Sequence, residues 1–209
     1  MAYRRTASVE ARLRRTRDTI LRAARQRIAA DGLHGVSVAD VAATAGVSVG
    51  TVYRHVADKT ALLREVVDDI CRMEIGVVAK VATEPGSDAD RLLAAVETFA
   101  RRAVASGRVA YAVIAEPAPP DVERLRVGLR RDLAEAFASV IADGVAAGEF
   151  PAQDPMITAT AIVGAVSEVL VGPLSPTDRT AADTDLALAE VVAHIRRAVI
   201  GAPGPRGAE

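Results

Sequence analysis

The sequence predicts an all-α protein, and three observations support this fold class. Half of the 209 residues are hydrophobic and a quarter are charged, which is the composition of a globular protein. Aromatic residues make up only 3% of the chain, whereas Ala, Leu and Arg, which favour helix, are abundant. No stretch shows the alternation of polar and apolar residues, bounded by turn signals, that indicates a strand. We therefore expect an N-terminal three-helix domain followed by a larger helical domain.

Charge is distributed unevenly between these two parts. Residues 1–59 carry 11 Lys and Arg against 5 Asp and Glu, and the remainder carries 15 against 22. The net charge of −1 therefore conceals a basic front and an acidic rear. This asymmetry is typical of a two-part protein whose front contacts a polyanion.

The chain opens with a basic segment and a first helix. Residues 1–13 are rich in arginine, and we predict a basic N-terminal arm there. Residues 14–31 are predicted to form the first helix, which Gly32 stops. Its apolar face holds Ile20, Ala24 and Ile28. With the two helices that follow, this helix is expected to form a domain over residues 14–60.

Two short helices follow, joined by a turn that is too tight for a loop of any size. Ser37 caps "SVADVAATAG", with Asp40 in the capping-box position, and Ser48 caps "VSVGTVYRHV". Gly46 lies between them, where a tight turn needs a positive φ. The spacing of four valines predicts a core shared by the two helices: Val41, Val47, Val52 and Val56. Two helices joined at a steep angle by a short Gly-containing turn form a helix-turn-helix.

The second domain is predicted to span residues 61–201, with a disordered tail at 202–209. A fourth helix, capped by Asp58, is expected to continue to about residue 81, so that it belongs to both domains. Breaks rich in Pro and Gly separate the remaining helices. We expect these helices at residues 88–105, 108–116, 122–147, 156–171 and 182–200.

Residues 155–174 are apolar over a length that can cross a bilayer, with Glu168 as their one charge. Because this segment has Pro near both ends and no basic flank, we expect a helix buried in protein. The N-terminus lacks the apolar region of a secretory signal. Cys71 is the single cysteine, which excludes an internal disulfide. We therefore expect a cytoplasmic protein.

The exposed side of the third helix has residue types that can bind DNA. Its N-terminal turn can enter a major groove, so we predict base-edge contacts there. These contacts are predicted for Ser48, Val49 and Thr51. Phosphate contacts are predicted for Ser37, Tyr53, Arg54, His55 and Lys59. The arginines of the arm either follow phosphates as well or lie free in solvent.

The stretch "SVADVAATAGVSVGTVYRHVADKTALLREVV" resembles the signature of the TetR (tetracycline repressor) family of one-component regulators. The resemblance covers about residues 16–67 and departs from the common family pattern at Val56, where Phe is frequent. It implies an Ω-shaped, all-α homodimer with a ligand cavity in the C-terminal domain, which leaves DNA when ligand binds. It also implies that the helices near 156–171 and 182–200 form a four-helix dimer interface.

Two sets of candidate residues follow in the second domain. Small residues on one side of the apolar helix permit close helix approach, and the candidate dimer interface is Ala161, Gly164, Ala165 and Glu168. The scarce aromatic residues and their neighbours either line a cavity or fill the ordinary core, which is the more frequent role of each one. The candidate cavity residues are Phe99, Arg102, Tyr111, Ile114, Phe137 and Met156.

We therefore predict a ligand-responsive transcriptional regulator, expected to repress. It would bind a palindromic operator as a homodimer and be released by an apolar or amphipathic effector, without a membrane partner. The alternative is a small-molecule binding protein whose DNA-binding head is vestigial. No catalytic or cofactor motif is present, and His34 and His194 lack partners at metal-ligand spacing, so we expect no enzyme activity, cofactor or metal site. Cys71 is either a packing residue, which we favour, or a thiol sensor.

Overall fold

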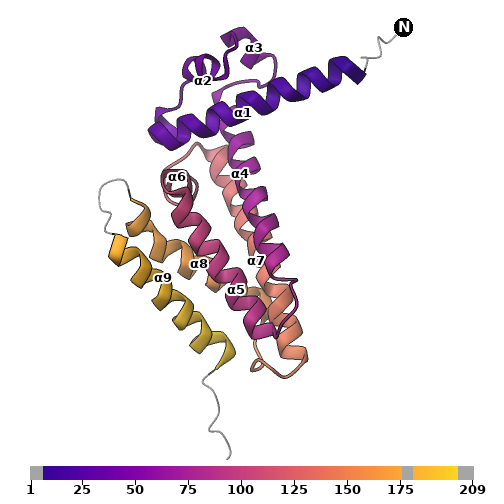
Figure 1. Cartoon of the computed structure of the whole chain (residues 1–209), viewed down its shortest axis with the longest axis vertical. Helices are drawn as coiled ribbons and strands as arrows, with labels where there is room; N and C mark the ends of the chain where they lie inside the picture. The colour runs from indigo at the N-terminus through magenta and orange to yellow at the C-terminus, as the bar shows by residue number, and fades with distance from the viewer. Residues whose placement is uncertain (1–6, 176–180, 202–209) are drawn as a thin grey trace, which may run out of the picture.

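The computed structural model describes residues 7–175 and 181–201, which form helices and no strand. The predicted all-α class is thus confirmed. An N-terminal head consists of α1 (Ala7–Gly35), α2 (Val38–Ala45) and α3 (Val49–Tyr53). The remaining elements are α4 (Lys59–Val81), α5 (Asp88–Ser106), α6 (Arg108–Ile114), α7 (Pro120–Ala146), α8 (Pro155–Leu174), α9 (Ala181–Ile195) and a π-helical turn (Arg196–Ile200). In Figure 1 the head lies across one end of a bundle built from the long helices, and α4 leads from the head into that bundle.

The five helices expected in the second domain are all present. Each end lies within three residues of the expected position when the π-helical turn is counted with α9. The bundle is organised around α7, which packs against α4, α5 and α8. The tail expected at 202–209 lies outside the described residues.

The first helix is longer than the sequence predicts. It begins at Ala7, so residues 7–13 of the predicted arm are helical, while residues 1–6 lie outside the described part. Arginine is a good helix former, and here the run of arginines continues the helix instead of preceding it. The predicted stop at Gly32 is a kink with φ 74°, after which the chain continues to Gly35.

The three predicted N-caps are confirmed. The side chains of Ser37, Ser48 and Asp58 accept the backbone N–H groups of Asp40, Thr51 and Ala61. The turn between α2 and α3 is made at Gly46, whose φ of 65° lies in the left-handed region that glycine favours. The third helix is shorter than predicted, since it ends at Tyr53.

The head and the bundle share a hydrophobic core. The predicted valines Val41, Val52 and Val56 are buried between α2, α3 and α1, whereas Val47 is half-buried. The same cluster continues into α6 and α7 through Val109, Ala112, Val122 and Leu129. A second cluster fills the bundle among α5, α7, α8 and α9. The core of the head is therefore completed by residues from the second domain.

Within one chain the apolar helix α8 is buried on one side. That face packs into the bundle, and about a third of its most apolar stretch is buried. In length and composition this helix meets the criteria for crossing a membrane. Within a single chain the predicted burial is therefore met on one side of α8. Its outer face carries Ile157, which is 71% exposed.

Candidate nucleic-acid interface and ligand cavity

The residues predicted to meet base edges are linked by hydrogen bonds at the start of α3. Ser48 Oγ accepts the N–H of Thr51 and lies 2.9 Å from its Oγ1. Arg54 Nη2 donates to the same Oγ1 at 2.7 Å. Val49, next to this group, is 42% exposed, although burying an apolar side chain is favourable. The surface is therefore a fixed polar cluster with one exposed apolar side chain, which suits contact with hydrogen-bonding edges and methyl groups.

The residues predicted to contact phosphate surround this cluster, and they differ in how free their donors are. Tyr53 is half exposed. Lys59 is exposed at the first position of α4, where its Nζ donates to the carbonyl of His34 at 3.3 Å. The hydroxyl of Ser37 is directed to the carboxylate of Asp40, so this donor is already engaged. His55 is half-buried just after α3.

Arg17 is a functional candidate that sequence reasoning missed. Its Nη1 donates to the carbonyl of His55 at 3.4 Å, and its Nη2 pairs with Glu65 at 2.7 Å. Arg17 thereby ties α1 to the turn between α3 and α4. Sequence reasoning could not single it out in this arginine-rich stretch, because no local pattern separates it from its exposed neighbours.

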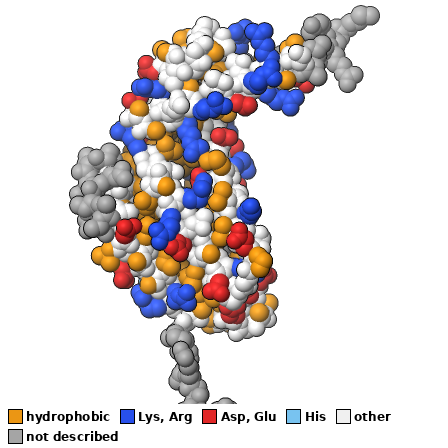
Figure 2. Space-filling view, viewed as in Figure 1, with side chains coloured by type: hydrophobic (Ala, Val, Ile, Leu, Met, Phe, Trp, Pro, Cys, Tyr) orange, Lys and Arg blue, Asp and Glu red, His pale blue; other side chains and the backbone are white. Residues whose placement is uncertain are grey.

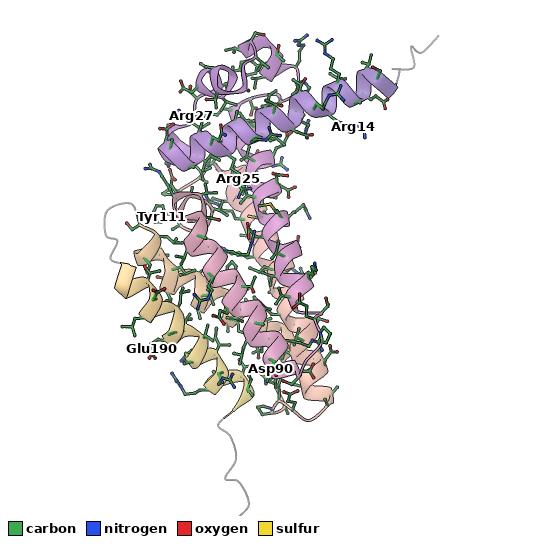
Figure 3. All side chains as sticks on the ribbon, in the orientation of Figure 1. Arg14, Arg25, Arg27, Asp90, Tyr111 and Glu190 are labelled. Carbon is green, nitrogen blue, oxygen red and sulfur yellow. The ribbon has the colours of Figure 1, made fainter. Side chains whose placement is uncertain are left out.

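Figure 2 shows Lys and Arg side chains gathered over the outer half of α1, and Arg14 on that half is labelled in Figure 3.

A cavity of about 100 Å³ lies in the second domain, with walls from α4 to α8. Three of the predicted residues line it: Phe99, Arg102 and Ile114. Three do not. Phe137 is fully buried in the bundle core, Met156 is 37% exposed at the start of α8, and Tyr111, labelled on α6 in Figure 3, packs half-buried against the bundle core. Aromatic character alone was a poor guide because a helical bundle needs large side chains in its core as well.

Charged side chains form one part of the cavity wall. Arg102 makes a bidentate ion pair with Glu74 at 2.5 and 3.0 Å, and this hydrogen bonding raises the pKa of Arg102. Arg126 is 4% exposed, and desolvation by burial lowers its pKa. Arg130 Nη2 donates to the carbonyl of Ile114 at 3.1 Å. Sequence reasoning found only Arg102, because Arg126 and Arg130 lie on α7, beyond α6, and no local pattern links them to it.

A chain of hydrogen bonds runs from the cavity wall to the head. Arg126 donates to the carbonyls of Ala112 and Glu116, at the end of α6 and just after it. The carboxylate of Glu116 accepts the N–H groups of Leu33 and His34, each at 3.1 Å, at the kink in α1. Gly32 is needed here because a Cβ would meet a Glu116 oxygen at 2.7 Å. The carbonyl of His34 accepts from Lys59, so the chain ends at a predicted phosphate contact.

The predicted interface residues lie on the outer face of α8. Ala161, Gly164 and Glu168 are exposed and Ala165 is half-buried. On the neighbouring helix α9, Leu186 is 62% exposed, and Glu190, labelled in Figure 3, is exposed as well. The two helices pack against each other. The exposed sides of these two packed helices therefore carry small, apolar and charged side chains.

Cys71 lines the cavity with a thiol that is poorly ionised. Burial raises its pKa to about 12, so the thiol stays protonated at neutral pH. Within residues 7–175 and 181–201, no group of three or more His, Cys, Asp and Glu side chains is placed to hold a metal ion.

The chain matches two family models. Residues 20–66 match the model described as bacterial regulatory proteins, tetR family. Residues 85–191, about half of the chain, match the model described as tetracyclin repressor-like, C-terminal domain. No curated protein matches the chain in sequence.

Several solved structures share the fold. The transcriptional regulator FadR from Bacillus subtilis, in complex with stearoyl-CoA, has a TM-score of 0.75 at 18% identity and covers 88% of this chain and 98% of its own. The fatty acid degradation regulator FadR from Bacillus halodurans has a TM-score of 0.71 at 20% identity, and the match covers 90% of this chain and 99% of that regulator. A regulatory protein in the tetR family from Rhodococcus RHA1 has a TM-score of 0.65 at 23% identity, and the match covers 90% of this chain and 98% of that protein. At these identities the likeness establishes the fold.

The buried thiol leads to a prediction about alkylation. At pH 8, iodoacetamide should react with Cys71 in the folded chain at least about a hundredfold more slowly than in the urea-unfolded chain, because the nucleophile is the thiolate. Mass spectrometry of timed samples measures the two rates, with Cys71→Ala as the blank. Equal rates would instead identify a reactive thiol.

Proposed function

Because the chain belongs to the TetR family of bacterial regulatory proteins, we propose that it binds operator DNA as a homodimer and that a small-molecule effector releases it. The observation that carries this proposal is the exposed polar cluster of Ser48, Thr51 and Arg54, fixed on a short helix over a buried valine core. Such rigidity suits direct readout, because base contacts need side chains held in a defined geometry.

In the proposed complex, the first turn of α3 enters the major groove. Val49 meets a thymine methyl, and the hydroxyls of Ser48 and Thr51 meet base edges. Tyr53, His55 and Lys59 hold the backbone phosphates, with Lys59 adding its charge to the N-terminus of α4. Arg54 binds a phosphate, and its hydrogen bond to Thr51 Oγ1 also orients the hydroxyl that meets a base edge. The hydroxyl of Ser37 must leave Asp40 before it can donate to a phosphate.

The homodimer is proposed to form through the outer faces of α8 and α9. Small side chains such as Gly164 and Ala161 allow helices to approach closely, and Ile157 and Leu186 supply apolar area that one chain leaves in water. Dimerisation also has a functional reason, because one short recognition helix contacts too little DNA for useful specificity. Two heads on a dyad would meet major grooves about 34–36 Å apart.

Release by an effector is proposed to act through α4 and the Glu116 contact. The Bacillus subtilis FadR structure holds stearoyl-CoA, and the cavity described here is the corresponding candidate for an effector in this chain. Both α4 and α6 contribute to its wall, α4 continues from the head, and the segment after α6 holds the α1 kink through Glu116. Effector binding would favour a spacing of heads that does not fit adjacent grooves, with a coupling free energy of about 1–3 kcal/mol.

Selection from random duplexes tests this function. The purified full chain should enrich a palindrome whose half-sites are separated by about one helical turn or a multiple of it. Enrichment of no sequence would contradict the proposal. If such a chain still bound small molecules, the alternative of a vestigial DNA-binding head would be favoured.

Lys59→Ala should weaken the binding of operator DNA and of non-operator DNA by the same factor. Loss of one phosphate contact should also reduce the slope of log affinity against log salt by about one. Fluorescence anisotropy at several salt concentrations measures both quantities. The other lysine of the chain, Lys80, lies in the last turn of the same helix, so Lys80→Ala is the matched control. An unchanged slope for Lys59→Ala would argue against the phosphate contact.

Glu116→Gln should loosen the joint between the head and the bundle. The amide presents one acceptor oxygen in place of two and removes charge-assisted hydrogen bonds, each worth about 1.5–3 kcal/mol. Hydrogen exchange at the amides of Leu33 and His34 should therefore accelerate about tenfold or more, and operator affinity should fall. Glu84→Gln, at an exposed site after α4, is the control. Exchange as slow as in the parent chain would show that Glu116 does not hold this kink.

A further inference from the structure

The cavity has an apolar wall over most of its surface. Ile70, Ile75, Phe99, Leu133 and Val163 line it, together with the alkyl parts of longer side chains. An occupant must therefore offer an apolar body, since a polar body would leave its own groups unpaired there. The cavity volume of about 100 Å³ fits a small ligand. A ligand with a long alkyl chain would require the surrounding helices to move apart.

The charge on this wall is not balanced. Three arginines and one glutamate line the cavity, and Glu74 is fully engaged by Arg102. Arg126 has a partner in Glu123 at 2.8 Å, whose side chain is 46% exposed. Arg130, which is exposed, has no carboxylate within 4 Å in the described part of the chain, and its Nη2 donates to the carbonyl of Ile114. Among the described residues, its charge at the cavity therefore has no opposite charge beside it.

Arg126 also keeps an unused donor at the cavity. Its Nη atoms bond to Ala112, Glu116 and Glu123, but its buried Nε–H has no hydrogen-bond partner among the described residues. An unmade hydrogen bond on a charged group that is 4% exposed is costly. A water molecule would satisfy the Nε–H group, and solvent reaches the exposed guanidinium of Arg130. An anion between them would bind both groups through stronger, charge-assisted hydrogen bonds.

We propose that the effector has an apolar body and a carboxylate head, which Arg126 Nε–H and the guanidinium of Arg130 bind. This inference rests on the proposed function and deepens it by naming the ligand class. A carboxylate suits the site because it accepts two charge-assisted hydrogen bonds from guanidinium groups. The same two arginines hold the carbonyls of Ala112, Ile114 and Glu116 at the end of α6. The head group therefore competes with the Ile114 carbonyl for Arg130 and adds a ligand to the same Arg126 whose Nη atoms hold Ala112 and Glu116, so its binding reaches the Glu116 contact with α1.

Matched probes test the head group. Titration calorimetry on the full chain compares hexanoate and decanoate with 1-hexanol and 1-decanol. Each acid should bind at least about tenfold more tightly than the alcohol of the same chain length, because only the acid carries a charge for the arginines. Alcohols that bind as tightly as the acids, or acids that do not bind, overturn the proposal.

Arginine variants assign the binding to the site. Arg130→Gln should weaken acid binding about tenfold and leave alcohol binding within about twofold. The control is Arg131→Gln, the next residue on α7, which pairs with Glu135 and does not line the cavity. Arg130 is preferred to Arg126 because it is exposed, and circular dichroism of the variant checks its fold. Acid binding that survives Arg130→Gln unchanged overturns the proposal.

The operator assay separates this inference from the proposed function. Acids that bind through Arg130 without releasing the selected operator support the ligand class and contradict effector release. Release of the operator by the alcohols, with no preference for the acids, supports effector release and overturns the ligand class.

Discussion

The carboxylate of Glu116 accepts the N–H groups of Leu33 and His34 where α1 kinks at Gly32, and this contact joins the head to the bundle. The contact supplies acceptors to two N–H groups where the kink at Gly32 interrupts the helical backbone. The contact also brings the end of α6 against the head, next to the carbonyl that accepts from Lys59. Cavity wall and candidate DNA surface are thus connected through a few charge-assisted hydrogen bonds.

Apolar packing reinforces this joint. Val109 and Ala112 of α6 and Val122 and Leu129 of α7 belong to the same buried cluster as the valines of the head. A displacement of α6 therefore disturbs the core beneath α2 and α3, because closely packed interiors transmit strain. The head does not behave as a separate domain on a flexible linker. Its hydrophobic core is completed by residues of α6 and α7 from the second domain.

Two features of the single chain are incomplete without further partners. The outer face of α8 leaves apolar side chains such as Ile157 in water, and the cavity holds a buried Nε–H on Arg126 without an acceptor. The first is an unmatched area, which a second copy of the chain can cover. The second is an unmatched donor on a cavity wall with more arginine than carboxylate, and a small anion would complement it. The raised pKa of Cys71 argues against a thiol reaction as the signal at this cavity.

The local sequence determined the helices, their caps, the turn at Gly46 and the valine core of the head. Each of these depends on neighbours within a few residues, so spacing and residue type are sufficient to predict them. The same local signals identified the family and the candidate DNA surface, but placed the start of α1 too late and made α3 too long. The prolines near its ends and the lack of a basic flank indicated that α8 is buried in protein, but they do not show which of its faces one chain covers.

Only the tertiary structure decided how distant segments meet. Glu116 reaches residues more than eighty positions earlier in the chain, and Arg126 and Arg130 meet the end of α6 across a helix break. Aromatic character selected Phe99 correctly for the cavity wall but also Phe137, which fills the bundle core. The physical reason is that the residues next to a charged or aromatic side chain follow the same sequence pattern whether it lines a cavity or fills the core. Its role depends on which helices pack around it, and that packing is set by the whole chain.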